Sequence, residues 1–355
     1  YNVVADAMLE DYYGLDKWFK PEVNLKLNIK PIPGLNYQQV VGYENRQWEL
    51  HQYWPSTHRS EIDNSRKGHA HLAFSKTENL TSEGYFSYVK DFKGGHNLNA
   101  TAGYSYFEVN GENFGMDNYN FSVDGIKYWD IGQGSYLTDG KAGMSSGKSV
   151  TERLFSFFAR ANYSYQDKYM LSASIRHEGS SKFAADNRWA NFWSATAGWR
   201  ISNEEFMKDF DWLDDLKIRF GYGVTGNNDF SATYMANMLG SDTNWMMPNG
   251  TWAYSYGKSQ NVNPNLGWEE KKEWNLGVDY SFFEGRLYGK FDYYRREVDN
   301  LLFSVKVPQP PYTQGSQMQN IGSMESKGWE FEVGGDIIRT KDFTWSSSMN
   351  LSHNT

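Results

Sequence analysis

Apolar and polar residues alternate along most of this 355-residue chain. In the stretch 23–30, Val23, Leu25, Leu27 and Ile29 share one face and polar residues fill the other. The same alternation runs through 155–165, 169–176, 216–225, 274–282, 329–333 and 343–351. A period of two is typical of β-strands, whereas a helix would interrupt it every third or fourth residue. The pattern predicts about twelve strands.

The connections between these strands alternate between short and long. The short ones lie at 31–34, 92–97, 165–169, 282–286 and 338–343. The long ones are expected at 46–81, 107–151, 177–188, 226–269 and 297–325. Tight turns on one side and extended loops on the other are typical of outer-membrane barrels. One longer turn, 202–212, pairs Ser202 with Glu205 as a capping box and predicts a short amphipathic helix on the short-turn side.

Composition agrees with a membrane barrel. The chain has 14 Trp, 25 Tyr and 22 Phe, as aromatic girdles require, yet its mean hydropathy is −0.72. No stretch approaches the run of about 18 apolar residues that a membrane-spanning helix needs. The net charge of −8 argues against nucleic-acid binding, and the lack of cysteine removes disulfides and thiol nucleophiles. We expect an all-β, transmembrane antiparallel β-barrel; a soluble, aromatic-rich lectin sandwich is the alternative.

Twelve strands in an open sheet would leave two bare edges in lipid, where backbone groups find no partner. We therefore expect residues 1–355 to be part of a single, larger barrel domain that continues beyond both ends of this chain.

Several motifs name a family. The stretch 161–207 contains a Tyr-x-x-Lys-Tyr turn, Arg176 before Gly179-Ser180-Ser181, Asn187-Arg188-Trp189, and Ala197-Gly198-Trp199-Arg200. LKIRFGYGVTGNND (216–229), NPNLGWEEKKEWNLGVDY (263–280) and NIGSMESKGWEFEV (320–333) follow in order. Together they resemble the SusC/RagA family of TonB-linked outer-membrane proteins, most firmly over 152–355.

The resemblance implies a 22-stranded barrel plugged by a separate domain, in the outer membrane of a Gram-negative, Bacteroides-type bacterium. It implies import of a large nutrient, a glycan or a peptide, driven through the TonB complex. A SusD-like surface lipoprotein is the expected partner, together with outer-membrane lipid. On this resemblance we expect the plug domain, the TonB box, the N-terminal extension and the final strands to lie outside these residues. No catalysis and no cofactor are expected. A lidless receptor for a siderophore or vitamin, and a structural or adhesive barrel, remain open.

Aromatic residues in the expected long loops are the candidate contacts with substrate or lid. Aromatic faces stack on sugar rings, and the same residues anchor protein partners. The candidates are Trp245, Trp252, Tyr254, Tyr256, Trp48, Trp54 and Trp129. On the polar face of the strands, Arg160, Arg176, Lys217 and Arg219 are expected to face the lumen and the plug.

Other motifs are weaker. Gly221-x-Gly223-x-x-Gly226 fits a dinucleotide fingerprint in letters, but no helical pattern follows it. His69 and His71 share a strand face and could hold a metal ion, although exposed loop residues are the preferred interpretation. Asp214-Asp215 and Glu269-Glu270 are neighbours on strands and so point to opposite faces. No Ser/His/Asp grouping supports an outer-membrane protease or lipase.

Overall fold

The computed structural model describes residues 3–235 and 239–355. The strands are β1 (Asp11–Phe19), β2 (Glu22–Asn28), β3 (Leu35–Trp54), β4 (His69–Phe92), β5 (His96–Tyr119), β6 (Gly143–Lys148), β7 (Glu152–Tyr165), β8 (Tyr169–Ser180), β9 (Trp189–Arg200), β10 (Leu213–Asn227), β11 (Leu239–Met246), β12 (Trp252–Lys258), β13 (Glu269–Phe282), β14 (Leu287–Asp299), β15 (Leu302–Lys306), β16 (Ser316–Asn320), β17 (Ser323–Arg339) and β18 (Thr344–Asn354).

Helices are few and short. They are α1 (Val3–Leu9), α2 (Arg59–Asp63) and the 3-10 turns η1 (Asp124–Ile126), η2 (Ile131–Gln133), η3 (Ala185–Asn187), η4 (Ile201–Asn203), η5 (Glu205–Met207) and η6 (Ala232–Met235). In the described ranges, no helix has the length and apolar character that crossing a membrane requires.

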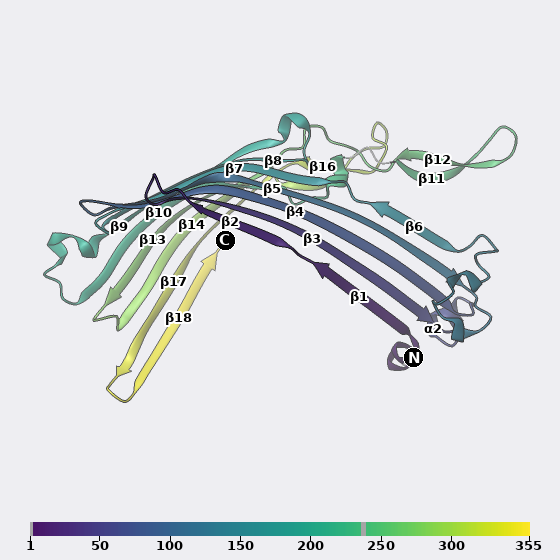
Figure 1. Ribbon diagram of the computed structural model, residues 1–355, viewed down its shortest axis with the longest axis horizontal. Coiled ribbons are helices and arrows are strands. Elements are labelled where there is room, and N and C mark those ends of the chain that lie inside the picture. Colours follow the sequence, from purple (N-terminus) through teal and green to yellow (C-terminus); the bar gives the residue numbers. More distant parts are fainter. Residues whose placement is uncertain (1–2, 236–238) are drawn as a thin grey trace. The chain divides into compact units, whose positions relative to one another are not determined.

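The chain forms two compact units that share the long strands β3, β4 and β5. The smaller unit comprises 1–23, 41–82 and 107–152, and the larger comprises 24–40, 83–106 and 153–355. The hydrogen-bonded order is β1-β3-β4-β5-β6 in the smaller unit and β2-β3-β4-β5-β7-β8-β9-β10-β13-β14-β17-β18 in the larger. Among the described residues, the hydrogen-bonded series from β1 through β3, β4, β5 and β7 to β18, which we call the main path, contains twelve strands, as the alternation predicted. Figure 1 shows β13, β14, β17 and β18 lying side by side in the larger unit.

From β7 to β18, neighbouring strands of the larger sheet are antiparallel, and their register separates two faces. Arg160 lies opposite Ser174, which in turn lies opposite Ser194. On the other face, Ile175 lies opposite Ala159 and Trp193. That second face exposes a row of large apolar side chains, namely Phe157, Leu171, Ile175, Trp193, Phe220, Leu276 and Phe291. A continuous apolar face on a sheet with a polar opposite face is what a lipid-facing barrel wall requires.

One of the expected loops is largely strand, and another begins as strand. The chain runs as β3 to Trp54 and resumes as β4 at His69, so only 55–68 remains of the predicted loop 46–81. Likewise β5 continues to Tyr119, within the predicted loop 107–151. Because β4 and β5 have 24 residues each, they are more than twice as long as a strand that crosses a bilayer. Polar residues in these extensions were read as loop.

The predicted helix at 202–212 is also wrong. Two 3-10 turns, η4 and η5, occupy its start, and the extended backbone of Glu204 (ψ 149°) separates them. The Ser202 hydroxyl donates to Asp215 Oδ1 (3.0 Å), so it does not cap a helix.

Candidate ligand-binding loops

The loop between β10 and β13 carries an antiparallel hairpin, β11–β12, that forms its own two-stranded sheet. Figure 1 shows the pair apart from the longer strands. Met246 lies opposite Trp252, and the turn between them closes with a hydrogen bond from Met247 N–H to Thr251 O (2.7 Å). Gly250 takes the positive φ (81°) that this tight turn requires.

One face of β12 is a row of exposed aromatic rings, which we call the aromatic row. Trp252, Tyr254 and Tyr256 stand two residues apart and are 66%, 74% and 70% exposed. Residues at this spacing point to the same side of a strand. Exposing three neighbouring rings to water costs free energy unless another molecule covers them. The row is therefore suited to stacking on a ligand or partner. Trp245 lies in β11 opposite Ala253, and its side chain is outside the described part of the chain.

The other aromatic candidates have different surroundings. Trp48 and Trp54 belong to β3, not to a loop. The Trp54 ring stacks on His69 (4.5 Å between centroids), so it is engaged within the smaller unit. Trp129 does lie in a loop, between η1 and η2, and is 76% exposed beside Tyr128. The structure therefore brings Trp252, Tyr254 and Tyr256 together, whereas Trp48, Trp54 and Trp129 belong to the separate smaller unit.

The four predicted lumen-facing cations lie on one face of their strands. Register places Gly223 opposite Ser194, so Lys217 and Arg219 share the face of Arg160 and Arg176. Arg219 bridges two neighbouring strands, with Asp279 at 2.9 Å and Asp292 at 3.0 Å. Arg176 lies 3.3 Å from Glu178 and donates to the Ser105 hydroxyl. Arg160 makes a weaker contact with Asn162 Oδ1 (3.4 Å). Strand carboxylates thus already neutralise Arg219 and Arg176, and a facing plug remains a prediction.

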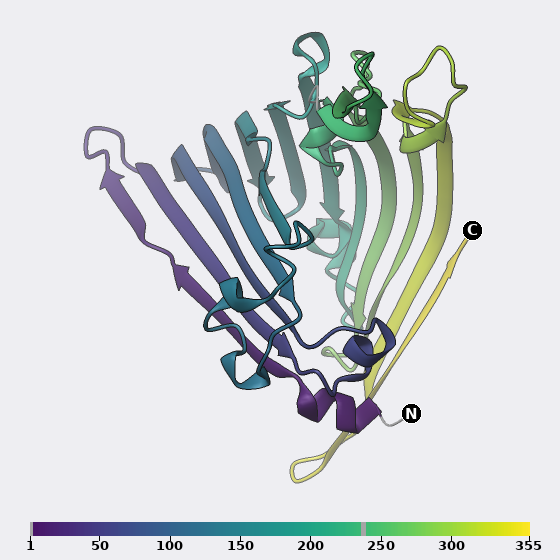
Figure 2. The same cartoon turned by 90° about the vertical axis from the view of Figure 1, so that its right-hand side faces the viewer.

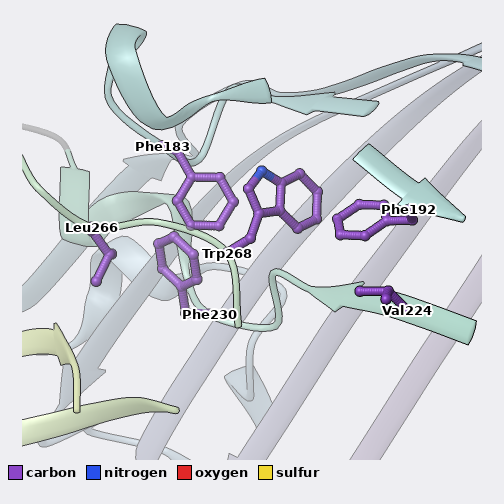
Figure 3. Packing of buried hydrophobic residues seen from close by; sticks show 6 residues of the cluster. All are labelled: Phe183, Phe192, Val224, Phe230, Leu266 and Trp268. Carbon is purple, nitrogen blue, oxygen red and sulfur yellow. The ribbon is translucent and has the colours of Figure 1, made fainter. Parts of the chain in front are cut away.

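A small hydrophobic cluster, the loop core, fixes the bases of the long loops. It comprises Phe183, Phe192, Val224, Phe230, Leu266 and Trp268. Figure 3 shows Trp268 between Phe183 and Phe192, at centroid distances of 4.9 and 5.3 Å. The Trp268 indole N–H donates to Arg188 O (3.0 Å), which ties the Asn187-Arg188-Trp189 motif to this cluster. One of the motifs that carries the family resemblance therefore helps to fix the loop bases.

The dinucleotide reading of Gly221-x-Gly223-x-x-Gly226 fails in the structure. Strand β10 continues to Asn227, and the next helical turn, η6, starts only at Ala232, too late for the motif to meet a phosphate at a helix start. Gly226 instead makes room for a ring, because a Cβ there would lie 2.0 Å from Phe192 Cζ.

His69 and His71 are not loop residues. Both lie at the start of β4, where Asp117 Oδ1 is 2.8 Å from His69 Nε2 and from His71 Nδ1. The His69 ring is sandwiched between Trp54 and Tyr119. Over the described ranges, no group of three or more His, Asp or Glu side chains is arranged to hold a metal ion. Asp117 could not be inferred from the spacing of the histidines, because it lies 46 residues beyond His71 and reaches it through strand pairing.

Asp124 joins the two loops of the smaller unit. It accepts hydrogen bonds from the Ser56 N–H (2.9 Å), the Ser56 hydroxyl (2.7 Å) and the Tyr53 hydroxyl (2.9 Å). Partial burial opposes ionisation, but these donors outweigh it and lower the pKa of the Asp124 carboxyl. The carboxylate therefore fixes the 120–142 segment against the end of β3.

A polar cavity was missed by the sequence analysis. It has a volume of about 400 Å³ and lies among the segments 231–234, 259–261 and 314–317. Figure 2 shows the green loop after β10 and the yellow-green segment around β15 and β16 at the same end of the strands. Amides and hydroxyls without charges, as in SQN at 259–261 and QGSQ at 314–317, were the available signal.

Comparison with known proteins places this fold. The family model described as TonB dependent receptor-like, beta-barrel matches residues 10–355. TonB-dependent receptor P39 of Formosa agariphila is 33% identical over 92% of this chain and 30% of its own length. TonB-dependent receptor SusC of Bacteroides thetaiotaomicron is 39% identical over 61% of this chain and 22% of its own length.

Among solved structures, the RagAB peptide importer in its closed-closed state superposes with a TM-score of 0.86 at 24% identity. The match covers 98% of this chain and 37% of that chain, and it supports the fold alone. This chain thus spans about a third or less of the curated relatives P39 and SusC. The chain belongs to the TonB-dependent receptor-like β-barrel family, and its resemblance to the SusC/RagA proteins is confirmed.

Proposed function

We propose that this chain forms part of the barrel wall and the loops of an outer-membrane, TonB-dependent importer. The imported molecule is a large nutrient, a glycan or a peptide. The observation that carries the proposal is the aromatic row of Trp252, Tyr254 and Tyr256, exposed on a hairpin in a long loop of a two-faced sheet. The apolar strand face suits lipid, and the hairpin suits a ligand or lid at the mouth of the barrel. SusC is named a TonB-dependent receptor and RagAB a peptide importer, which supports uptake as the activity.

We further propose that a SusD-like surface lipoprotein covers the loops and shares the aromatic row with the substrate. Rings that stack on sugars also serve as central anchors at protein interfaces. Mild-detergent purification of the native protein, followed by mass spectrometry of co-purifying material, tests this. A stoichiometric lipoprotein supports the lidded importer. A lone barrel that retains a metal chelate supports a siderophore-type receptor, and a lone barrel without cargo supports a structural or adhesive role.

Uptake by energised cells tests the role of the aromatic row. Replacing Trp252, Tyr254 and Tyr256 together by Ala is expected to reduce uptake of the growth nutrient at least tenfold, because stacking surface is lost while the strands are untouched. Phe206→Ala is the matched control, since Phe206 is similarly exposed (62%) but lies in the turn at the other end of β10. Equal uptake by the triple variant and the control would contradict the assignment of the aromatic row as a contact with substrate or lid. Uptake that persists after the proton-motive force is collapsed would sink TonB dependence.

A further inference from the structure

The loops of the larger unit enclose a polar cavity of about 400 Å³, which we call the amide cavity. Its volume falls within the range of small-molecule sites. Three segments form it: 231–234 at η6, 259–261 after β12, and 314–317 before and within β16. All three belong to the long connections that follow β10 and β14, so the cavity lies with the loops and not within the strand wall.

The wall of the amide cavity is polar but uncharged. Apart from Gly315, each lining residue contributes an amide or hydroxyl group, and none of those in the described ranges is Asp, Glu, Lys, Arg or His. The lining includes Thr233, Tyr234, Gln260, Asn261, Gln314 and Gln317. Such a wall can donate to and accept from neutral hydroxyl groups, whereas a buried charge on a ligand would find no counter-ion.

The wall is held in place without a ligand. Asn261 is only 9% exposed, and its Nδ2 donates to Gln314 O (2.7 Å) and Ser316 O (2.9 Å). Its Oδ1 accepts from the N–H groups of Thr313 and Gln314 (3.2 Å each). The Gln260 side chain also donates to Thr233 O, which joins the first two segments. A site whose wall is already ordered loses less conformational entropy on binding.

Tyr234 adds an aromatic surface to this wall. It lines the cavity and packs against the loop core, so its position is fixed from behind. A ring beside amides and hydroxyls matches the two surfaces of a sugar, whose C–H face stacks while its hydroxyls form hydrogen bonds. A peptide that placed a charged terminus or side chain in this cavity would desolvate that charge without compensation.

We propose that the amide cavity binds a neutral sugar unit, and that the imported nutrient is a neutral oligosaccharide in preference to a peptide or a uronic-acid polymer. This inference rests on the proposed import function and names its substrate class. The cavity is a second contact, separate from the aromatic row, so that a chain of several sugars engages both the hairpin and the loop base.

Isothermal titration calorimetry on the full-length protein in detergent tests the proposal. The probes are maltohexaose, cellohexaose, xylohexaose and mannohexaose, with hexagalacturonate and hexa-alanine as charged comparisons. We expect one neutral hexasaccharide to bind, and Thr233→Ala and Tyr234→Ala each to weaken it at least tenfold. The matched control is Gln133→Ala, which removes an exposed amide from a loop of the smaller unit. Tighter binding of hexagalacturonate or hexa-alanine, or no binding of any neutral probe, overturns the proposal.

Two further measurements separate folding and import from binding. Gln314→Glu keeps the shape of the side chain and adds a charge, and we expect at least tenfold weaker binding with unchanged heat-modifiable migration on gels. Wild-type affinity in this variant and in Tyr234→Ala overturns the cavity assignment. Nutrient uptake by the same strains, with and without the proton-motive force, is read independently. If uptake depends on the proton-motive force but the cavity variants bind the sugar as tightly as wild type, only the cavity assignment is rejected. If uptake does not depend on the proton-motive force, the proposed import function is rejected.

Discussion

Glu204 illustrates how one turn residue fixes the short-turn end of two strands. Its carboxylate accepts from the Tyr169 hydroxyl (2.6 Å), the Lys168 ammonium (3.0 Å) and the Trp199 indole N–H (3.1 Å). These donors, the Tyr169 hydroxyl foremost, lower the pKa of Glu204 from 4.5 to about 2. Tyr169 and Trp199 lie opposite each other on β8 and β9, where an interfacial aromatic girdle is expected. The carboxylate thus orients the polar ends of the girdle.

We predict a pH-dependent loss of stability in Glu204→Gln. A lowered folded-state pKa means that ionised Glu204 stabilises the fold above pH 4.5, and that this contribution disappears as the pH falls toward 2. The variant should therefore unfold at lower urea concentration than wild type at pH 7, and the gap should close near pH 2. Unfolding in detergent micelles measures both. Glu205→Gln is the control, because Glu205 contacts Lys208 on an exposed turn and its pairing contributes little. A gap that is independent of pH would contradict the prediction.

Gly226 gives a second prediction at a single position. An added methyl group at this glycine would lie 2.0 Å from Phe192 Cζ, and Phe192 is buried in the loop core. We expect Gly226→Ala to lower the free energy of unfolding by about 1–3 kcal/mol, as overpacking does. Gly257→Ala is the control, because no atom lies within 4 Å of the corresponding Cβ in β12. Equal free energies for the two variants would show that the Phe192 ring moves aside freely.

Sequence reasoning located the exposed aromatic residues better than it located polar contacts. Trp252, Tyr254 and Tyr256 are large aromatic residues and stand out in a polar segment. Asn261 and Asp117 do not, because amides and carboxylates are common in loops and strand extensions. Their roles come from partners more than 40 residues away, such as Gln314 for Asn261 and His71 for Asp117. Only tertiary pairing supplies that information.

At the scale of elements, strand number was predictable and strand length was not. Alternation persists wherever one face is apolar, and it gave the twelve strands of the main path among the described residues. In the parts of β3, β4 and β5 that belong to the smaller unit, polar residues occupy both strand faces, so the alternation fades although the strands continue. The 46–81 and 107–151 segments were misread for this reason. In the same way, Ser202 and Glu205 matched a helix cap by spacing, but Asp215 competes for the Ser202 hydroxyl.

The loop after β5 should depend on Asp124. Asp124→Ala removes three hydrogen bonds and leaves the hydroxyl of Tyr53, which is only 2% exposed, without its acceptor. An orphaned buried hydroxyl costs about 1–3 kcal/mol. We therefore expect limited proteolysis to cut the 120–142 segment at least several times faster than in wild type. Asp130→Ala is the matched control, since that carboxylate accepts a hydrogen bond from the Gln133 side chain within its own turn. Equal cleavage rates for both variants would rule out the clamp.

At the scale of the whole molecule, the two faces of the sheet determine which solvent each side chain meets. Charged pairs such as Arg219 with Asp279 lie on one face, and the exposed apolar row lies on the other. Family membership places such strands in a barrel wall, with the apolar face toward lipid. The membrane environment explains why so many large apolar side chains are exposed in this fold, an arrangement that would aggregate in water.

Ile175 and Ser174 test this assignment, because they are neighbours on β8 that face opposite sides. Ile175 is 52% exposed and lies six residues after the start of the strand at Tyr169. That separation is about 20 Å along the strand, which a barrel tilt of about 40° reduces to roughly 15 Å, near the middle of the apolar band. We expect Ile175→Arg to destabilise the folded barrel in lipid vesicles by about 2–4 kcal/mol. Ser174→Arg, on the polar face, should cost far less, because the new guanidinium can remain hydrated. Its repulsion with Arg160, directly opposite, costs only about 0.2–1 kcal/mol. Urea unfolding in lipid vesicles measures both variants. If Ser174→Arg proves the more harmful of the two, the faces are reversed and the lumen assignment of Arg160, Arg176, Lys217 and Arg219 fails with them.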